Sequence, residues 1–237
     1  MKLVFYFVHC LLFCCFFSDA KETARLKPLV FSYVSHPIIE LHLKPRISEA
    51  YRKLGYKVRF VNMPSDRFIR QFESGAVDGD VARLGQLTSV LPSMLLVYQF
   101  DQLELTLQCR PGLSCVEADL DNPENLLFIP AQSQVFRMLQ LNYKAQVYTV
   151  RDWSQLIDLY NEGKIDRFFW LEGHKLKTGQ LPPTNSLLIK TPQLALYHVL
   201  HKSNAELAPL VKAELEKTRQ KRASADIKTE DKNTTNK

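Results

Sequence analysis

Two charged residues that could recognise a small molecule, Asp80 and Arg83, stand three positions apart in this 237-residue chain. The planar guanidinium of Arg83 matches a carboxylate through two parallel hydrogen bonds. The carboxylate of Asp80 can accept from a ligand ammonium group or can hold Arg83. A surface arginine that pairs with a carboxylate is the structural alternative for Arg83. If Arg83 binds the ligand, we expect its replacement by alanine to abolish binding and to leave thermal stability nearly unchanged.

Tyr33 is a candidate contact at the end of a strand predicted over residues 29–33. Open α/β sheets bind ligands at the carboxyl ends of their strands, so the ring of Tyr33 is placed to face a cleft. Packing in the core is the alternative for this ring. Ser35 and His36, in the loop that follows, are further candidates.

Two more candidate regions follow predicted strands in the second half of the chain. Gln132 and Ser133 lead from a strand into a helix, whose free N–H groups attract anions, although Ser133 serves equally well as the helix N-cap. Phe169 and Trp170 end another strand and must point to opposite faces, because strand side chains alternate. We expect Trp170 to face the cleft, with Glu172 beyond it.

The sequence lacks the patterns of common catalytic sites. It contains no Gly-x-Ser-x-Gly turn, no His-Glu-x-x-His zinc motif and no GxxxxGK[ST] phosphate loop. The histidines are scattered without metal-ligand spacing, and His198 and His201 are expected on one face of a helix. We therefore predict a binding protein that is not an enzyme and needs no metal or cofactor, with an enzyme on the same fold as a remote alternative.

A phrase that occurs twice indicates how the chain positions these residues. Phe72–Asp78 and Tyr160–Asp166 each read aromatic, two polar residues, Gly, one residue, a β-branched residue and Asp. Glycine adopts the left-handed conformation that ends a helix, and a β-branched residue favours a strand. Gly75 and Gly163 therefore mark two helix–strand junctions, and the repeat predicts two similar α/β units with a ligand cleft between them.

Apolar periodicity predicts alternating strands and helices on both sides of these junctions. The first unit has strands over 29–33, 57–61 and 77–82, a helix over 43–54 and a helix with Ser65 as its N-cap. Extended segments over 95–100 and 103–109 cross to the second unit, which has strands over 126–129, 147–150 and 165–170 and helices over 135–141 and 153–160. Residues 187–190 are expected to be extended, and 194–201 and 206–219 helical.

The first twenty residues have the character of a secretory signal peptide. Lys2 precedes an apolar run over 3–17, and Ser18-Asp19-Ala20 places small residues where signal peptidase cleaves. The run is shorter than the roughly 20 residues of a membrane-spanning helix. We predict cleavage near Ala20, export to the periplasm and a soluble mature chain.

Only two of the five cysteines, Cys109 and Cys115, lie outside this signal peptide. A closely spaced pair in an exported protein predicts a local disulfide, and the Pro111-Gly112 turn between them brings its ends together. Two thiols without nearby histidines do not complete a zinc site. A catalytic dithiol would have the shorter Cys-x-x-Cys spacing.

The chain is basic, with 31 Lys and Arg against 25 Asp and Glu and a net charge of +6. Much of this charge lies in residues 218–237, which lack aromatic residues and apolar periodicity. Such a composition predicts a solvated, disordered tail. We expect no nucleic-acid partner.

In the order and spacing of these parts the chain resembles the family 3 extracellular solute-binding proteins, the periplasmic proteins best known from amino acid uptake. The resemblance covers about residues 27–217 and rests on Gly75–Asp80, Glu162–Asp166 and the closing segments 196–202 and 206–208. It implies an α/β fold with two lobes, each a mostly parallel sheet flanked by helices, joined by extended hinge strands. Lobe 1 would comprise 27–102 and 187–217, and lobe 2 would comprise 103–186.

The resemblance also implies a function. A monomer of this family holds a small polar, amino-acid-like or carboxylate-bearing ligand between its lobes, with Arg83 on the ligand carboxylate. It delivers that ligand to an ABC permease, binds it alone or reports it to a membrane sensor. This chain departs from the pattern at Ala131–Ser133, where a Gly-Thr-type run is usual, and after Asp166, where the usual ammonium-binding Asp is missing. These departures indicate a ligand other than an ordinary α-amino acid.

Overall fold

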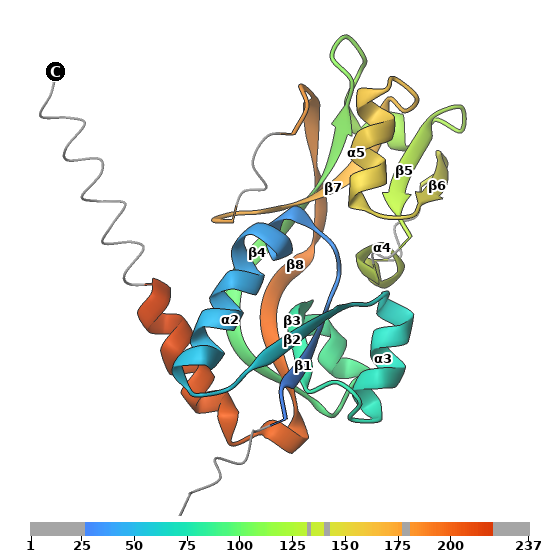
Figure 1. The fold of residues 1–237 in the computed structure, drawn as a ribbon. Helices are drawn as coiled ribbons and strands as arrows, with labels where there is room; N and C mark the ends of the chain where they lie inside the picture. The colour runs from blue at the N-terminus through green and yellow to red at the C-terminus, as the bar shows by residue number, and fades with distance from the viewer. Residues whose placement is uncertain (1–26, 132–133, 140–142, 177–180, 220–237) are drawn as a thin grey trace, which may run out of the picture.

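The computed structural model describes residues 27–131, 134–139, 143–176 and 181–219, which form two lobes (Figure 1). The predicted signal peptide, Gln132, Ser133 and residues 220–237 of the predicted tail lie outside the described residues. Within the described part of the chain, no helix combines the length and apolar character needed to cross a membrane.

The first lobe contains three parallel strands, β1 (Leu29–Tyr33), β2 (Val58–Asn62) and β3 (Gly79–Leu84). The central strand, β1, pairs with both of the others. One crossover runs through the π-helical turn η1 (Ile39–Leu43) into α2 (Lys44–Lys53), and the other through α3 (Ser65–Glu73). The predicted alternation of this lobe is confirmed, because each crossover helix covers apolar strands that must be shielded from water.

The second lobe repeats this arrangement. Its strands are β5 (Leu126–Pro130), β6 (Gln146–Val150) and β7 (Arg167–Gly173), and β5 pairs in parallel with both neighbours. Its helices are α4 (Gln134–Leu139) and α5 (Trp153–Asn161). Three short 3₁₀ turns complete the connections of the chain: η2 (Gly85–Ser89), η3 (Glu117–Leu120) and η4 (Lys202–Asn204).

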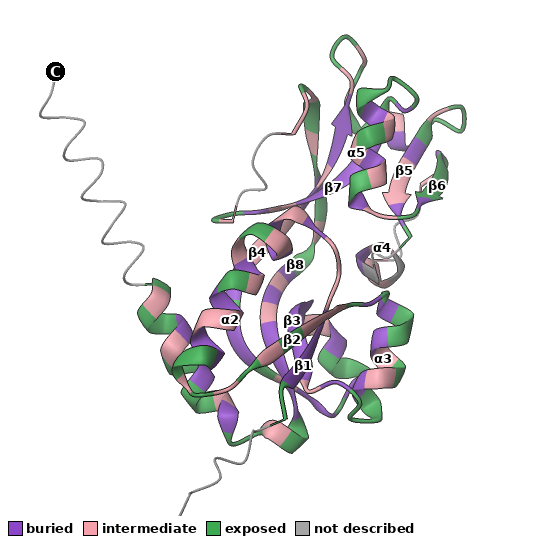
Figure 2. Ribbon diagram, in the orientation of Figure 1, coloured by how far each residue is buried: buried purple, intermediate pink, exposed green. Residues whose placement is uncertain are grey.

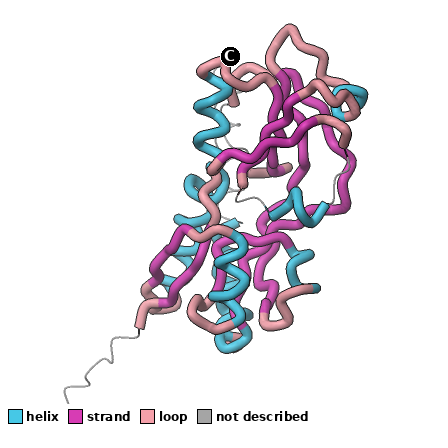
Figure 3. The backbone as a smooth tube through the Cα atoms, turned by 90° about the vertical axis from the view of Figure 1, so that its right-hand side faces the viewer, coloured by secondary structure: helices cyan, strands magenta, loops and turns pink. Residues whose placement is uncertain are grey.

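Two long antiparallel strands, β4 (Met94–Cys109) and β8 (Asn185–His201), join the lobes. They complete one eight-stranded sheet in the order β2-β1-β3-β8-β4-β7-β5-β6. The side view in Figure 3 shows strands passing between the lobes. The two extended segments predicted over 95–100 and 103–109 are therefore parts of one strand, β4. The lobe boundaries predicted at 102/103 and 186/187 fall within β4 and β8.

The helix predicted over Leu194–His201 is wrong, because these residues form the second half of β8. This half pairs with β3 on one side and β4 on the other. A strand covered on both faces is apolar nearly throughout, and a short apolar run fits helical and extended spacing alike. His198 and His201 consequently share no helix face: His198 contacts Tyr51, and the ring of His201 lies against Phe72.

The last described segment, 207–219, is helical, as expected. Its buried residues Leu207, Val211 and Leu215 belong to the main hydrophobic core. The helix lies beside α2 of the first lobe (Figure 1), where Glu214 approaches Lys53 to 4.0 Å. The chain thus returns to the lobe in which it began.

The repeated phrase forms the two predicted helix–turn–strand junctions. Gly75 has φ of 69° and Gly163 has φ of 73°, the left-handed region in which other residues are strained. In the first junction Asp78 accepts a hydrogen bond from the Val30 amide at 2.7 Å, which ties the turn to β1. The N-cap prediction for α3 is wrong: Pro64 occupies that position, and Ser65 is the first helical residue.

Buried apolar side chains form a core that extends through both lobes (Figure 2). It includes Phe31 and Val81 in the first lobe and Leu127 and Phe168 in the second. Because β4 and β8 contribute buried residues along their length, the core continues through the hinge strands. The two lobes are therefore parts of one packed structure.

The predicted disulfide between Cys109 and Cys115 is confirmed. We expect neither thiol to react with an alkylating reagent in the native protein until a reductant is added. The bridge closes a loop with a sequence separation of six, for which loop-closure entropy predicts a loss of about 2 kcal/mol in unfolding free energy on reduction. Mass spectrometry of alkylated peptides, with and without reductant, checks the bridge. Labelling of both cysteines without reductant would contradict it.

Candidate functional site

A cavity of about 90 Å³ lies between the two lobes. The first lobe contributes residues that follow β1 and the carboxyl end of β3, which is where open α/β sheets hold ligands. The second lobe contributes α4, the start of α5 and β7. The lining residues are Val34, His36, Ile38, Ile39, Ser65, Ala82, Arg83, Leu84, Leu87, Leu103, Val135, Met138, Trp153, Leu171 and Leu196.

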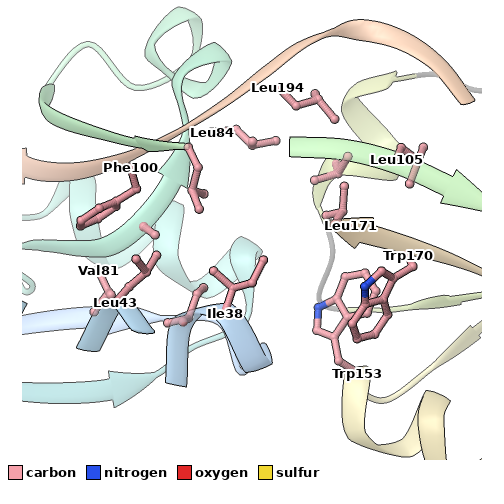
Figure 4. Packing of buried hydrophobic residues seen from close by; sticks show 14 of the residues in the cluster. Ile38, Leu43, Val81, Leu84, Phe100, Leu105, Trp153, Trp170, Leu171 and Leu194 are labelled. Carbon is pink, nitrogen blue, oxygen red and sulfur yellow. The ribbon is translucent and has the colours of Figure 1, made fainter. Parts of the chain in front are cut away.

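The walls of this cavity are mainly apolar. Figure 4 shows Ile38 and Leu84 on one side of the lobe junction and Leu171 and Trp153 on the other. Arg83 is the charged side chain among the described lining residues. The low polarity of these surroundings strengthens the electrostatic interactions of Arg83, so a ligand group that contacts it must be negatively charged or a hydrogen-bond acceptor.

Arg83 is buried, with only 5% of its surface exposed, and is held by two polar contacts. Its Nε donates to Asp80 Oδ2 at 2.8 Å, and its Nη1 donates to Ser65 Oγ at 3.2 Å. The guanidinium also lies 4.1 Å from the centre of the Phe68 ring. Its Nη2 is buried and has no hydrogen-bond partner among the described residues. Arg83 is therefore fixed in orientation with one donor group left over.

Asp80 is fully buried, and its oxygens are engaged within the protein. Oδ2 accepts from Ser32 Oγ at 2.6 Å as well as from Arg83, and Oδ1 accepts from the Ala82 amide at 2.9 Å. Burial raises the pKa of Asp80, and the Arg83 guanidinium and these hydrogen bonds oppose that rise. The geometry supports the predicted alternative in which Asp80 holds Arg83, because an oxygen with these partners is not presented to a ligand ammonium.

His36 supplies a second donor without a partner. The backbone amide of Ile38 donates to its Nδ1 at 3.2 Å, which places the ring proton of the neutral imidazole on Nε2. Nε2 is buried and has no partner among the described residues. Burial lowers the pKa of His36 to about 3, so the ring stays neutral near pH 7. His36 was a candidate in the sequence because it lies in the loop after a predicted strand.

His36 also contacts the opposite lobe through two tryptophans. Its ring centre lies 4.8 Å from that of Trp153 and 5.3 Å from that of Trp170. The two indoles meet edge-on at 5.0 Å. Sequence reasoning did not select Trp153, because its place in an apolar helix pattern equally describes a core residue. The three rings form an aromatic contact between the lobes beside the cavity.

Trp170 lies outside the cavity that contains Arg83. It is 1% exposed, its Nε1 donates to Glu172 Oε2 at 2.9 Å, and it lines a separate hollow of about 400 Å³ with Glu40 and Asp158. Phe169 packs with Phe136. Phe169 and Trp170 therefore have different partners, as expected for neighbouring strand residues that point to opposite faces.

Tyr33 lines neither of these two cavities. It is half-buried, and the Lys44 ammonium lies 4.1 Å from its ring centre. Gln132 and Ser133 lie outside the described residues. Of the residues selected from the sequence, the structure thus brings Arg83 and His36 to one cavity, with Asp80 directly behind Arg83. The described residues contain no cluster of three or more His, Cys, Asp or Glu suited to a metal ion.

No protein-family model matches the chain, and no curated protein sequence matches it either. Solved structures do match. The ligand-binding core of GluR0 from Nostoc punctiforme, in complex with L-glutamate, has a TM-score of 0.61 at 12% identity, over 82% of this chain and 94% of that one. The fold is that of the two-lobed amino-acid-binding proteins.

Two further solved structures share this fold. An ancestral arginine-binding protein bound to arginine has a TM-score of 0.58 at 13% identity, over 86% of this chain and 97% of that one. Arginine-bound ArgBP from T. maritima has a TM-score of 0.60 at 11% identity, over 80% of this chain and 95% of that one. These likenesses confirm the predicted α/β two-lobed fold class, and at such identities they concern the fold alone.

Proposed function

We propose that this protein is a solute-binding protein that captures a small carboxylate-bearing ligand between its lobes. The observation that carries the proposal is the buried, unpartnered Nη2 of Arg83 at the interlobe cavity. A buried donor without a partner costs about 1–3 kcal/mol, and more when it is charged. A ligand carboxylate removes that cost and gains a charge-assisted hydrogen bond.

The second observation in favour is how firmly Arg83 is held. Asp80 and Ser65 take up Nε and Nη1, so the guanidinium needs no reorganisation before it meets a ligand. Preorganisation of this kind raises affinity because less side-chain entropy is lost on binding.

The cellular setting belongs to the same proposal. We propose that the predicted signal peptide directs the mature protein to the periplasm. There it would act as a monomer and deliver its ligand to an ABC permease or bind it alone. A periplasmic sensor that signals to a membrane partner is the alternative. We propose a binding role without catalysis.

Arg83→Lys tests the proposed function. A metabolite library is first screened by thermal shift, because a ligand that binds only the folded state raises the melting temperature. For a ligand found in this way, we expect Arg83→Lys to lower the affinity about ten- to hundredfold in calorimetry, since lysine keeps the charge but loses the guanidinium fork. Lysine retains a cation beside Asp80, so this variant is the one suited to a binding assay.

Arg70→Lys is the matched control, because Arg70 is an exposed arginine on the nearby helix α3. Its affinity should equal that of the unmodified protein. Equal affinity of Arg83→Lys and the unmodified protein would remove Arg83 from the site. A screen without any stabilising metabolite, together with turnover of a substrate, would overturn the binding role.

A further inference from the structure

The cavity between the lobes has donors for an anion but no carboxylate for a cation. Arg83 and His36 each bring a buried nitrogen without a partner, and each residue is at least nine-tenths buried. No Asp or Glu is among the described residues that line the cavity. The unpartnered polar groups of the cavity are therefore donors, which suit an anionic ligand.

Asp80, the carboxylate that contacts Arg83, does not correct this imbalance. It is fully buried behind Arg83, and both of its oxygens accept hydrogen bonds from the protein. The acidic residues Glu40 and Asp158 line the adjoining hollow next to Trp170, which shares His36 and Trp153 with the cavity but does not include Arg83. An ammonium group in the cavity would be taken from water without a carboxylate partner, which is strongly unfavourable.

The remaining lining favours an aliphatic body. Leu103, Val135, Met138 and Leu171 supply apolar surface from the second lobe and the hinge. Each CH₂ group buried against such surface adds to the affinity. The volume of about 90 Å³ is below the roughly 150 Å³ of an apolar cavity that holds benzene. The cavity therefore suits a short skeleton.

We propose that the ligand is a short aliphatic monocarboxylate without an α-ammonium group, whose carboxylate is held by Arg83 and His36. This inference rests on the proposed function and names its ligand class. Arg83 supplies the charge, and the Nε2–H of neutral His36 supplies a second hydrogen bond. The aliphatic body lies against the apolar residues of the second lobe.

Matched pairs of compounds test the ligand class by calorimetry on the purified protein at pH 7. The first pair is propanoate and L-alanine, and the second is butanoate and L-2-aminobutanoate; the members of each pair differ by the α-ammonium group. We expect each acid to bind at least tenfold more tightly than its amino acid. The neutral compound butanamide should also bind at least tenfold more weakly than butanoate, because it has no charge for Arg83.

His36→Phe tests the second donor, because phenylalanine keeps an aromatic ring between the tryptophans but has no N–H group. We expect its affinity for butanoate to fall about tenfold, the loss of one hydrogen bond to a charged group. Unchanged affinity would overturn the role of His36. His174→Phe, at an exposed position, is the control and should leave the affinity unchanged.

The outcomes separate this inference from the proposed function. Equal or tighter binding of the amino acids, still weakened by Arg83→Lys, would overturn the ligand class and leave the solute-binding role standing. Absence of binding for all five compounds and for every compound in the metabolite screen would overturn both. Preference for the acids, lost in Arg83→Lys, would support both.

Discussion

Arg83→Ala is expected to lower the free energy of unfolding by about 3–5 kcal/mol, the cost of breaking a buried ion pair by removing one partner. Arg83 is 5% exposed and Asp80 is not exposed at all, so alanine would leave a buried carboxylate without its cation. Urea denaturation followed by circular dichroism measures the change. The sequence alone led us to expect that Arg83→Ala would leave stability nearly unchanged. The buried ion pair with Asp80 reverses that expectation.

Two control variants isolate the cause of this loss. Asp80→Asn combined with Arg83→Met removes both charges and should be markedly more stable than Arg83→Ala, because no unpaired charge is left. Arg52→Ala breaks an exposed ion pair with Glu49 and should cost at most about 1 kcal/mol. If Arg83→Ala were as stable as Arg52→Ala, the buried pair would not have the structural role that we assign to it.

Acidification from pH 6.5 to pH 4 is expected to destabilise the protein, with His198 contributing about 3 kcal/mol. Burial lowers the pKa of His198 from 6.5 to about 4. Over this interval the unfolded chain binds a proton that the folded chain excludes, so stability falls as the pH falls. His36, whose pKa burial lowers to about 3, acts in the same direction.

The surroundings of His198 explain why it stays neutral. Its Nδ1 lies 2.8 Å from the Asp80 carbonyl oxygen and its Nε2 lies 3.0 Å from the Tyr51 hydroxyl. The Phe31 ring covers it edge-on at 5.4 Å. Nδ1–H donates to the Asp80 carbonyl oxygen and the Tyr51 hydroxyl donates to Nε2, so the neutral ring satisfies both contacts. None of these contacts is a carboxylate that could stabilise the imidazolium.

Urea titrations at pH 7, 6, 5 and 4.5 measure this dependence. His198→Gln should be less stable at pH 7, because a buried polar network is disturbed, and should lose stability less steeply between pH 6.5 and 4.5. His174→Gln, at an exposed position, should follow the unmodified protein at every pH. A slope for His198→Gln equal to that of the unmodified protein would show that His198 does not carry the acid sensitivity.

The two α/β units could be predicted because their signals are local. Gly75 and Gly163 end helices through a backbone conformation that few other residues adopt, and the apolar runs around them repeat at the spacing of their elements. The disulfide followed from a short spacing and a turn between the cysteines. These features depend on neighbours in the sequence, so their outcome is largely independent of the rest of the chain.

The second half of β8 and the details of the site could not be predicted in this way. β8 is extended because β3 and β4, far away in sequence, cover both of its edges. Ser65 reads as a helix cap, yet its hydroxyl accepts from Arg83. Pairing of Asp80 with Arg83 was one of two readings, and burial favours it because a desolvated carboxylate needs a cation.

The sequence alone was sufficient for the strand–helix alternation, the two junction glycines and the arginine at the end of β3, because each depends on residue type and short spacing. The tertiary structure was needed to bring His36 and Trp153 from different lobes together, to turn Asp80 inward and to enclose Arg83 Nη2 without a partner. Contacts of this kind form between segments that are distant in the chain, and burial then sets whether a charged group serves the fold or faces a ligand.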